Sequence, residues 1–107
     1  FMVDEGFINA CRKPFYLINL SRGKIVSTTN LVEGLNSGEV LGACLDVLEY
    51  ESSSFENWLQ GNTVPPDLDQ LLKHPNVVLS PHVGGWTHES YFKLSDVLAD
   101  KILNSFL

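Results

Sequence analysis

The chain contains three short runs of apolar residues, each bounded by residues that favour turns. They cover residues 15–20, 41–47 and 77–80. The first run is rich in aromatic and branched side chains, and the second has small residues at its centre. Because the runs are continuous rather than alternating with polar residues, they predict strands that are covered on both faces of a parallel sheet.

The segment between the first two runs has the spacing of a helix. Its apolar residues recur three to four positions apart and would share one face. Thr28 or Thr29 can cap its start, and Gly38 can end it. We therefore expect a helix within residues 27–38.

Three further segments have helical character, at residues 4–10, 67–73 and 87–107. Strands that alternate with helices imply crossover connections and a parallel α/β sheet. Three strands and a few helices form a plausible half of a doubly wound sheet, but not a comfortable whole one. The irregular segment 49–66 is too long for a plain connection, so it is either functional or an insertion.

Composition narrows the class of protein. The 107 residues include 7 Lys or Arg and 13 Asp or Glu, a formal net charge of −6, which argues against nucleic-acid binding. No apolar run is long enough to span a bilayer, so no membrane partner is expected. Cys11 and Cys44 form neither a disulfide framework nor a metal motif, which indicates a reducing compartment and predicts a cytoplasmic protein.

Each predicted strand runs into a polar side chain that can carry chemistry. Arg22 follows the first strand, Asp46 ends the second, and His82 follows the third. The carboxyl ends of parallel strands meet at one edge of the sheet, where ligands bind in open α/β folds. We expect the three side chains to share that edge.

Each of these side chains also has an ordinary structural interpretation. Arg22 fits a surface turn, but its guanidinium can also grip a carboxylate with two hydrogen bonds. His82 fits a structural histidine, but it can also transfer protons near neutral pH. Glu49 and Glu51 fit solvated loop charges, but either can instead hold the imidazole. Asp46 at a strand end needs partners, because an isolated buried carboxylate is costly.

Other kinds of site are not indicated. The three histidines have no companion ligands at metal spacing, so we expect no metal. The sequence contains no Gly-x-Ser-x-Gly, no Gly-x-Gly-x-x-Gly and no phosphate-binding Walker loop.

The blocks at residues 18–23, 42–47 and 75–85 are, in this order, similar to the C-terminal third of the D-isomer-specific 2-hydroxyacid dehydrogenases, in particular to phosphoglycerate dehydrogenase-like members. Thr87 and the long last helix continue the pattern. The resemblance covers nearly the whole chain. It implies the C-terminal half of a Rossmann-like doubly wound parallel sheet within a larger two-domain protein. It also implies an NAD cofactor, with NADP left open, and a 2-hydroxy or 2-oxo acid substrate.

The resemblance also implies roles for single residues. Arg22 would bind the substrate carboxylate, His82 would be the general acid and base, and Glu51 would pair with His82. Several residues would line the nicotinamide end of the cofactor, namely Leu20, Ser21, Arg22, Asp46, His82, Gly84 and Gly85.

One departure from the family pattern concerns Glu51. Ser52 follows it where the family usually has proline, so Glu49 remains a competitor for the pairing role. The glycine-rich phosphate loop and most of the substrate domain are expected upstream of Phe1.

The resemblance carries wider expectations for the whole protein. The helix at 87–107 would return toward the absent substrate domain, and the full-length protein would be a homodimer. The 107 residues alone would bind dinucleotide weakly and turn over no substrate. The alternatives are a non-catalytic dinucleotide-sensing regulator and an interaction module on the same fold.

Overall fold

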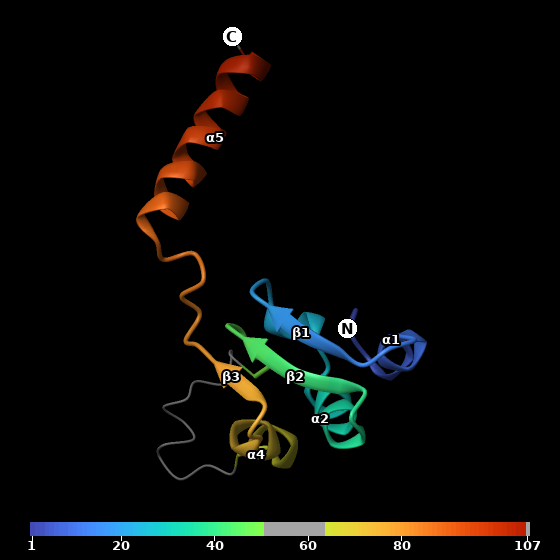
Figure 1. Cartoon of the computed structure of the whole chain (residues 1–107). Helices are drawn as coiled ribbons and strands as arrows, with labels where there is room; N and C mark the ends of the chain where they lie inside the picture. Colours follow the sequence, from blue (N-terminus) through green and yellow to red (C-terminus); the bar gives the residue numbers. More distant parts are fainter. Residues whose placement is uncertain (51–63, 107) are drawn as a thin grey trace.

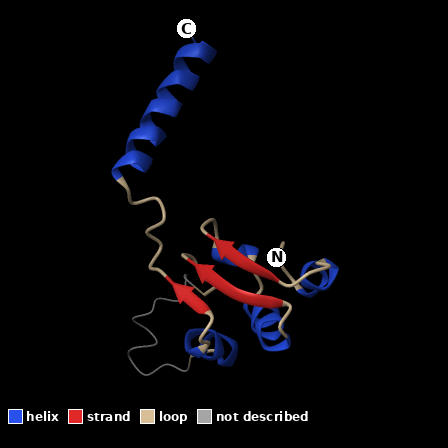
Figure 2. Cartoon of the chain, viewed as in Figure 1, coloured by secondary structure: helices blue, strands red, loops and turns tan. Residues whose placement is uncertain are grey.

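A computed structural model describes residues 1–50 and 64–106 of the chain. Its centre is a parallel sheet of three strands, β1 (Phe15–Asn19), β2 (Val40–Leu45) and β3 (Val77–Leu79), in the order β1-β2-β3 (Figures 1 and 2). The prediction of three parallel strands separated by helices is confirmed.

The first crossover helix, α2 (Thr28–Ser37), has well-defined ends. Ser27 is the N-cap, and its hydroxyl accepts the backbone amide of Asn30 at 3.4 Å. The prediction of a cap at Thr28 or Thr29 is therefore wrong, because both threonines already lie within the helix. Gly38 ends the helix as predicted, at a φ of 87° that glycine adopts without strain.

Three other short elements flank the sheet. Helix α1 (Glu5–Ala10) is capped by Asp4, whose carboxylate accepts the Phe7 amide at 3.0 Å. A 3-10 turn, η1 (Gly23–Ile25), follows β1. Helix α4 (Pro66–Lys73) starts with proline in its first turn, where a missing N–H costs nothing.

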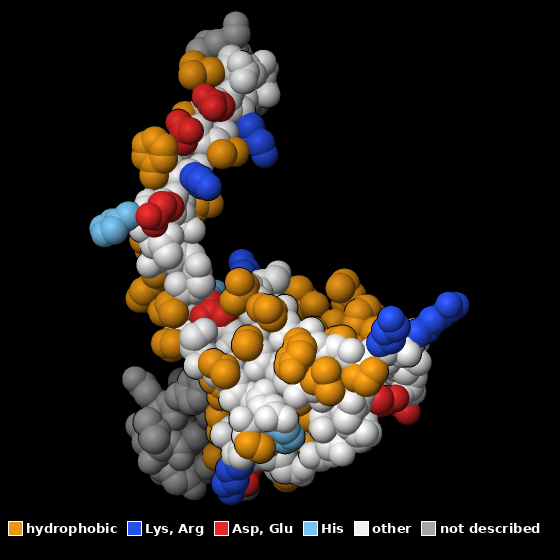
Figure 3. Space-filling view, in the orientation of Figure 1, with side chains coloured by type: hydrophobic (Ala, Val, Ile, Leu, Met, Phe, Trp, Pro, Cys, Tyr) orange, Lys and Arg blue, Asp and Glu red, His pale blue; other side chains and the backbone are white. Residues whose placement is uncertain are grey.

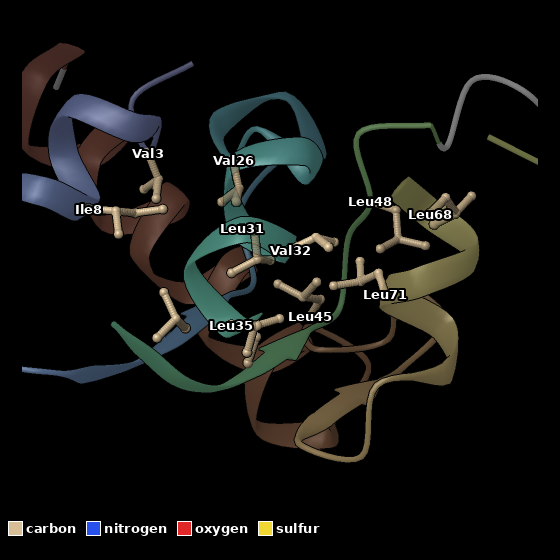
Figure 4. Packing of buried hydrophobic residues seen from close by; sticks show 12 residues of the cluster. Val3, Ile8, Val26, Leu31, Val32, Leu35, Leu45, Leu48, Leu68 and Leu71 are labelled. Atoms are coloured by element: carbon tan, nitrogen blue, oxygen red, sulfur yellow. The ribbon is translucent and has the colours of Figure 1, made fainter. Parts of the chain in front are cut away.

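The hydrophobic core lies between the sheet and helices α1, α2 and α4 (Figure 4). Leu31 on α2 and Leu68 and Leu71 on α4 are no more than 1% exposed. Burial of each such leucine stabilises the fold by about 1.5–3 kcal/mol. The core consists of Val3, Ile8, Val26, Leu31, Val32, Leu35, Val40, Ala43, Leu45, Leu48, Leu68 and Leu71.

The opposite face of the sheet is open. Ile18, Cys44 and Val78 are register partners across the three strands, and Ile18 and Val78 are 66% and 63% exposed. Tyr16 lies on the same face and is 73% exposed. Figure 3 shows hydrophobic side chains gathered over the strands. The continuous runs predicted strands that are covered on both faces. That prediction is wrong for the described residues, because helices α1, α2 and α4 all pack into one core.

The last helix, α5 (His88–Phe106), extends away from the sheet (Figure 1). Thr87 caps it, and its hydroxyl accepts the Ser90 amide at 3.0 Å. Its large apolar residues are exposed, among them Leu94 at 67% and Leu98 at 59%. Of the helices in the described residues, none combines the length and the apolar character needed to cross a membrane.

Candidate functional site

The carboxyl ends of the three strands are aligned. Asn19, Leu45 and Leu79 are register partners, so the loops that carry the candidate side chains begin at the same edge of the sheet. Backbone hydrogen bonds continue past the strands, from the Asp46 amide to the Asn19 carbonyl and from the Ser80 amide to the Leu45 carbonyl, both at 3.0 Å. The predicted alignment of the three strand ends at one edge of the sheet is confirmed.

The loop after β1 is braced by the side chain of Asn19, which is 6% exposed. Its amide nitrogen donates to the Arg22 carbonyl at 3.0 Å, and its oxygen accepts the Ser21 amide at 3.1 Å. One buried side chain thus fixes both ends of the Ser21–Arg22 turn. The backbone that carries Arg22 is held while its side chain remains exposed.

The guanidinium of Arg22 lies at the surface. Its Nη1 donates to the Ser21 carbonyl at 2.7 Å. In the part of the chain that the structure describes, no carboxylate forms an ion pair with it. The remaining donors of the planar fork suit an external carboxylate.

Gly23 brings the loop after β1 against the loop after β2. A Cβ placed on Gly23 would lie 1.8 Å from the Leu48 carbonyl oxygen and 2.6 Å from the Glu49 amide nitrogen. No side chain fits between these two backbones. The turn that carries Arg22 and the segment that leads to Glu51 are therefore in direct contact through Gly23.

Asp46, at the end of β2, holds the loop after β3. Its Oδ1 accepts the Ser80 hydroxyl at 2.5 Å and the Val83 amide at 2.9 Å, and its Oδ2 accepts the Gly84 amide at 2.8 Å. The residue is 3% exposed. The sequence predicted that a carboxylate buried at this strand end needs partners, and three hydrogen-bond donors supply them.

These contacts also set the charge of Asp46. The hydrogen bond from Ser80, together with those from Gly84 and Val83 and the nearby His82, outweighs burial and holds the pKa of Asp46 below its usual value. Asp46 is therefore a carboxylate at neutral pH, fixed at the centre of the aligned edge.

His82 has an unusual backbone conformation. Its φ is 57°, in the left-handed region, at an expected cost of about 1–2 kcal/mol for a residue with a side chain. The His82 amide donates to the Asp46 carbonyl at 2.9 Å and to the Ser80 carbonyl at 3.1 Å. The turn places the imidazole at the surface beyond β3. Strained backbone held by a bonded frame is typical of functional sites.

The two candidate partners of His82 are distinguished by the contacts of Glu49. Its Oε2 accepts the Thr28 backbone amide at 2.9 Å, at the first turn of α2. Glu49 is thus engaged by a helix N-terminus, a favourable place for a negative charge. Glu51 lies outside the described residues.

The other predicted cofactor residues differ in their surroundings. A Cβ on Gly84 would lie 2.9 Å from Asp46 Oδ2 and 3.6 Å from Leu20 Cδ2, so Leu20, Asp46 and Gly84 come together. Around Gly85 there is open space. Ser21 is exposed beside Arg22.

Two residues that shape the site, Asn19 and Ser80, were assigned no role from the sequence. Asn19 is a polar residue at the end of a buried apolar run, and such a residue needs a buried partner. Ser80 stands directly before the Pro81-His82 pair. Both signals were visible, but neither identifies the partner.

Comparison with known proteins agrees with this geometry. Residues 1–84, which include Arg22, Glu51 and His82, match the family described as "D-isomer specific 2-hydroxyacid dehydrogenase, NAD binding domain". The chain belongs to this family. Its fold is the Rossmann-like fold of that NAD-binding domain, and NAD is the cofactor of the family's domain.

Individual relatives support the assignment. The chain is 34% identical over 97 residues to an aromatic 2-oxoacid reductase of Clostridium sporogenes, a match that covers 90% of this chain and 29% of the relative. It is 35% identical over 103 residues to a D-3-phosphoglycerate dehydrogenase of Dictyostelium discoideum, covering 95% and 23%.

A solved structure gives the same result. The NAD-complexed D-isomer specific 2-hydroxyacid dehydrogenase of Lactobacillus delbrueckii ssp. bulgaricus matches with a TM-score of 0.70 and 38% identity, over 94% of this chain and 31% of that one. The chain therefore spans less than a third of the length of these relatives.

Proposed function

We propose that the whole protein transfers a hydride between NAD and a D-2-hydroxy or 2-oxo acid. The observation that carries the proposal is the placement of Arg22 and His82. Both are exposed on loops with fixed backbones, at the same edge of a parallel sheet that belongs to this dehydrogenase family. Reduction of a 2-oxo acid by NADH uses a cation that binds the substrate carboxylate and a group that donates a proton to the carbonyl oxygen.

The residues of the chain divide the chemistry between them. The Arg22 guanidinium binds and orients the substrate carboxylate with two hydrogen bonds. His82 donates a proton to the substrate carbonyl oxygen during reduction and removes it from the hydroxyl during oxidation. Glu51 pairs with His82 and orients the imidazole. The nicotinamide, when bound, supplies or accepts the hydride.

The strand-end residues suit the nicotinamide end of the cofactor. The space around Gly85 allows close approach to the backbone, and the hydroxyl of Ser21 is exposed. Leu20 adds apolar surface and Gly84 adds backbone surface to this region. Asp46 belongs to the same region, because its carboxylate accepts the Gly84 amide.

The test is oxidation of NADH by the full-length protein with a panel of aliphatic, aromatic and phosphorylated 2-oxo acids. NADPH is run in parallel, because the sequence leaves the choice between the two cofactors open. We expect Arg22→Lys to raise the KM for the oxo acid and His82→Gln to abolish turnover. Full activity in His82→Gln would contradict the proposal.

We further propose that the 107 residues alone bind dinucleotide weakly and are inactive. They contain no Gly-x-Gly-x-x-Gly loop, which in dinucleotide-binding folds places the pyrophosphate at a helix N-terminus. Titration of the isolated chain with NADH tests this, and micromolar affinity would contradict it.

A second candidate function is self-association, favoured by the open face of the sheet. Tyr16, Ile18 and Val78 expose apolar surface there, as do the apolar residues of α5. Exposed patches of this kind mark interaction sites. We propose that the full-length protein is a homodimer. Light scattering tests the assembly, and a clean monomer at micromolar concentration would contradict it.

We also propose that the full-length protein is cytoplasmic. Localisation of a tagged protein tests the compartment.

A further inference from the structure

We propose that Ser80 is a positioning residue, whose hydroxyl, through Asp46, fixes the left-handed backbone of His82 and so the direction of its imidazole. The catalytic consequence rests on the proposed function, whereas the structural claim does not. Ser80 touches no reacting atom in this assignment, so its effect passes through the turn.

The first step is that the turn needs to be held. A histidine with a φ of 57° has no glycine-like freedom, because its Cβ disfavours the left-handed region, so a negative φ is preferred unless contacts hold the turn. The two hydrogen bonds of the His82 amide fix where the turn starts. They do not fix the residues that follow His82.

The second step is that Asp46 holds the far side of the turn. Its two carboxylate oxygens accept the amides of Val83 and Gly84, the two residues directly after His82. His82 is therefore bracketed, with the Asp46 carbonyl on its own amide and the Asp46 carboxylate on the next two amides. The conformation of His82 depends on where that carboxylate points.

The third step is that Ser80 sets the direction of the carboxylate. The Ser80 hydroxyl donates to Asp46 Oδ1 at 2.5 Å, the shortest of the three contacts. Ser80 contributes a side-chain donor, whereas the other two donors are backbone amides, and it lies on the other side of His82 in the sequence. Ser80, Asp46 and the two amides thus close a loop of hydrogen bonds around His82.

Gly84 shows how closely this loop is packed. A Cβ on Gly84 would lie 2.9 Å from Asp46 Oδ2, so the carboxylate has little room to rotate in that direction. Without the serine hydroxyl, Oδ1 keeps only the Val83 amide and the carboxylate can turn away from Gly84. His82 would then relax toward negative φ.

The test compares Ser80→Ala with Ser80→Thr, which keeps the hydroxyl. Ser37→Ala is the matched control, because Ser37 also donates through its hydroxyl but lies near the start of β2, at the opposite end of the sheet. The first readout is the φ of His82, from three-bond couplings and carbon shifts in labelled protein. The second is kcat and both KM values of the full-length enzyme with NADH and a 2-oxo acid.

We expect Ser80→Ala to shift His82 away from positive φ and to lower kcat by about 10- to 100-fold, the range for a displaced catalytic group. The KM for NADH should change by less than about twofold, because a positioning residue acts on the chemical step rather than on uniform binding. Ser80→Thr should restore both readouts, and Ser37→Ala should change neither.

Two results would overturn the proposal. In the first, Ser80→Ala keeps both the His82 conformation and kcat. In the second, Ser80→Thr is as impaired as Ser80→Ala, which would make side-chain size rather than the hydroxyl responsible. If the wild-type protein reduces no 2-oxo acid, the proposed function fails, and the His82 conformation in the three variants alone decides the role of Ser80.

Discussion

The carboxylate of Glu49 accepts the backbone amide of Thr28 at 2.9 Å, which ties the loop after β2 to the first turn of α2. This contact gives Glu49 a structural role at a helix N-terminus. It removes the reason to assign Glu49 to His82 and leaves Glu51 as the proposed partner.

The first prediction compares the two glutamates. Glu51→Gln should lower kcat by at least about tenfold, the lower end for acid–base effects. Glu49→Gln should keep the activity and lose about 0.3–1 kcal/mol of stability, the value of a charge at a helix N-terminus. Initial rates and urea denaturation measure the two effects. Loss of activity in Glu49→Gln alone would reverse the assignment.

The two ends of α2 differ in how far local sequence determines them. Gly38 ends α2 as predicted, because a helix end needs only a residue that tolerates positive φ. Ser27, rather than Thr28 or Thr29, caps its start, although the three adjacent hydroxyl residues are equivalent on local grounds. The choice is made by tertiary contacts, since the Ser27 amide donates to the Val3 carbonyl and Val26 bridges to Val3.

The same distinction applies to the candidate site. Arg22, Asp46 and His82 were located because strand ends can be predicted from apolar runs, and parallel strands align those ends. The pairing of Ser80 with Asp46 joins residues 34 positions apart and depends on the path of the loop after β3. Spacing in the sequence carries no such information.

The second prediction concerns the contact between the loops after β1 and β2. Gly23→Ala places a methyl group 1.8 Å from the Leu48 carbonyl oxygen, so one loop must move. We expect a loss of more than about 3 kcal/mol in stability, as for severe strain at a buried position. Gly85→Ala is the control, because nothing lies within 4 Å of its Cβ position, and it should change stability by less than about 0.5 kcal/mol. Thermal and urea unfolding of both variants compare the two. Equal stability would contradict the close contact at Gly23.

The third prediction concerns acid. The pKa of Asp46 is held below the ordinary 3.8 by Ser80, Gly84 and Val83, so the carboxylate contributes stability that is fully present above that value. This contribution is lost as the pH falls through the lower, folded-state pKa. The amide proton shifts of Val83 and Gly84 should therefore change together only below pH 3.8. In Asp46→Asn both shifts should be altered at neutral pH and flat on acidification. A shared transition above pH 3.8 in the wild type would contradict the assignment.

The fourth prediction concerns Tyr50, which stands directly before Glu51. Its hydroxyl donates to Asp67 Oδ2 at 2.7 Å, and the Thr29 hydroxyl donates to the same oxygen at 3.0 Å. Burial, followed by the hydrogen bond and the charge of Asp67, raises the pKa of Tyr50 above its ordinary value of 10.0. Because the neutral phenol is favoured in the fold, its stabilising effect is present at neutral pH and is lost as the pH rises through the raised pKa.

Tyr50→Phe should therefore lower the unfolding free energy at pH 7 by about 1 kcal/mol, the net value of such a hydrogen bond. It should also remove the tyrosinate absorbance that appears only well above pH 10. Thr29→Val is the matched variant, because it removes the other donor to Asp67 and leaves the phenol in place. The two substitutions share one acceptor, so the double variant should differ from the sum of the single ones by more than the roughly 0.3–0.5 kcal/mol seen for independent sites. Strict additivity would mean that Asp67 does not couple Tyr50 to Thr29 on α2.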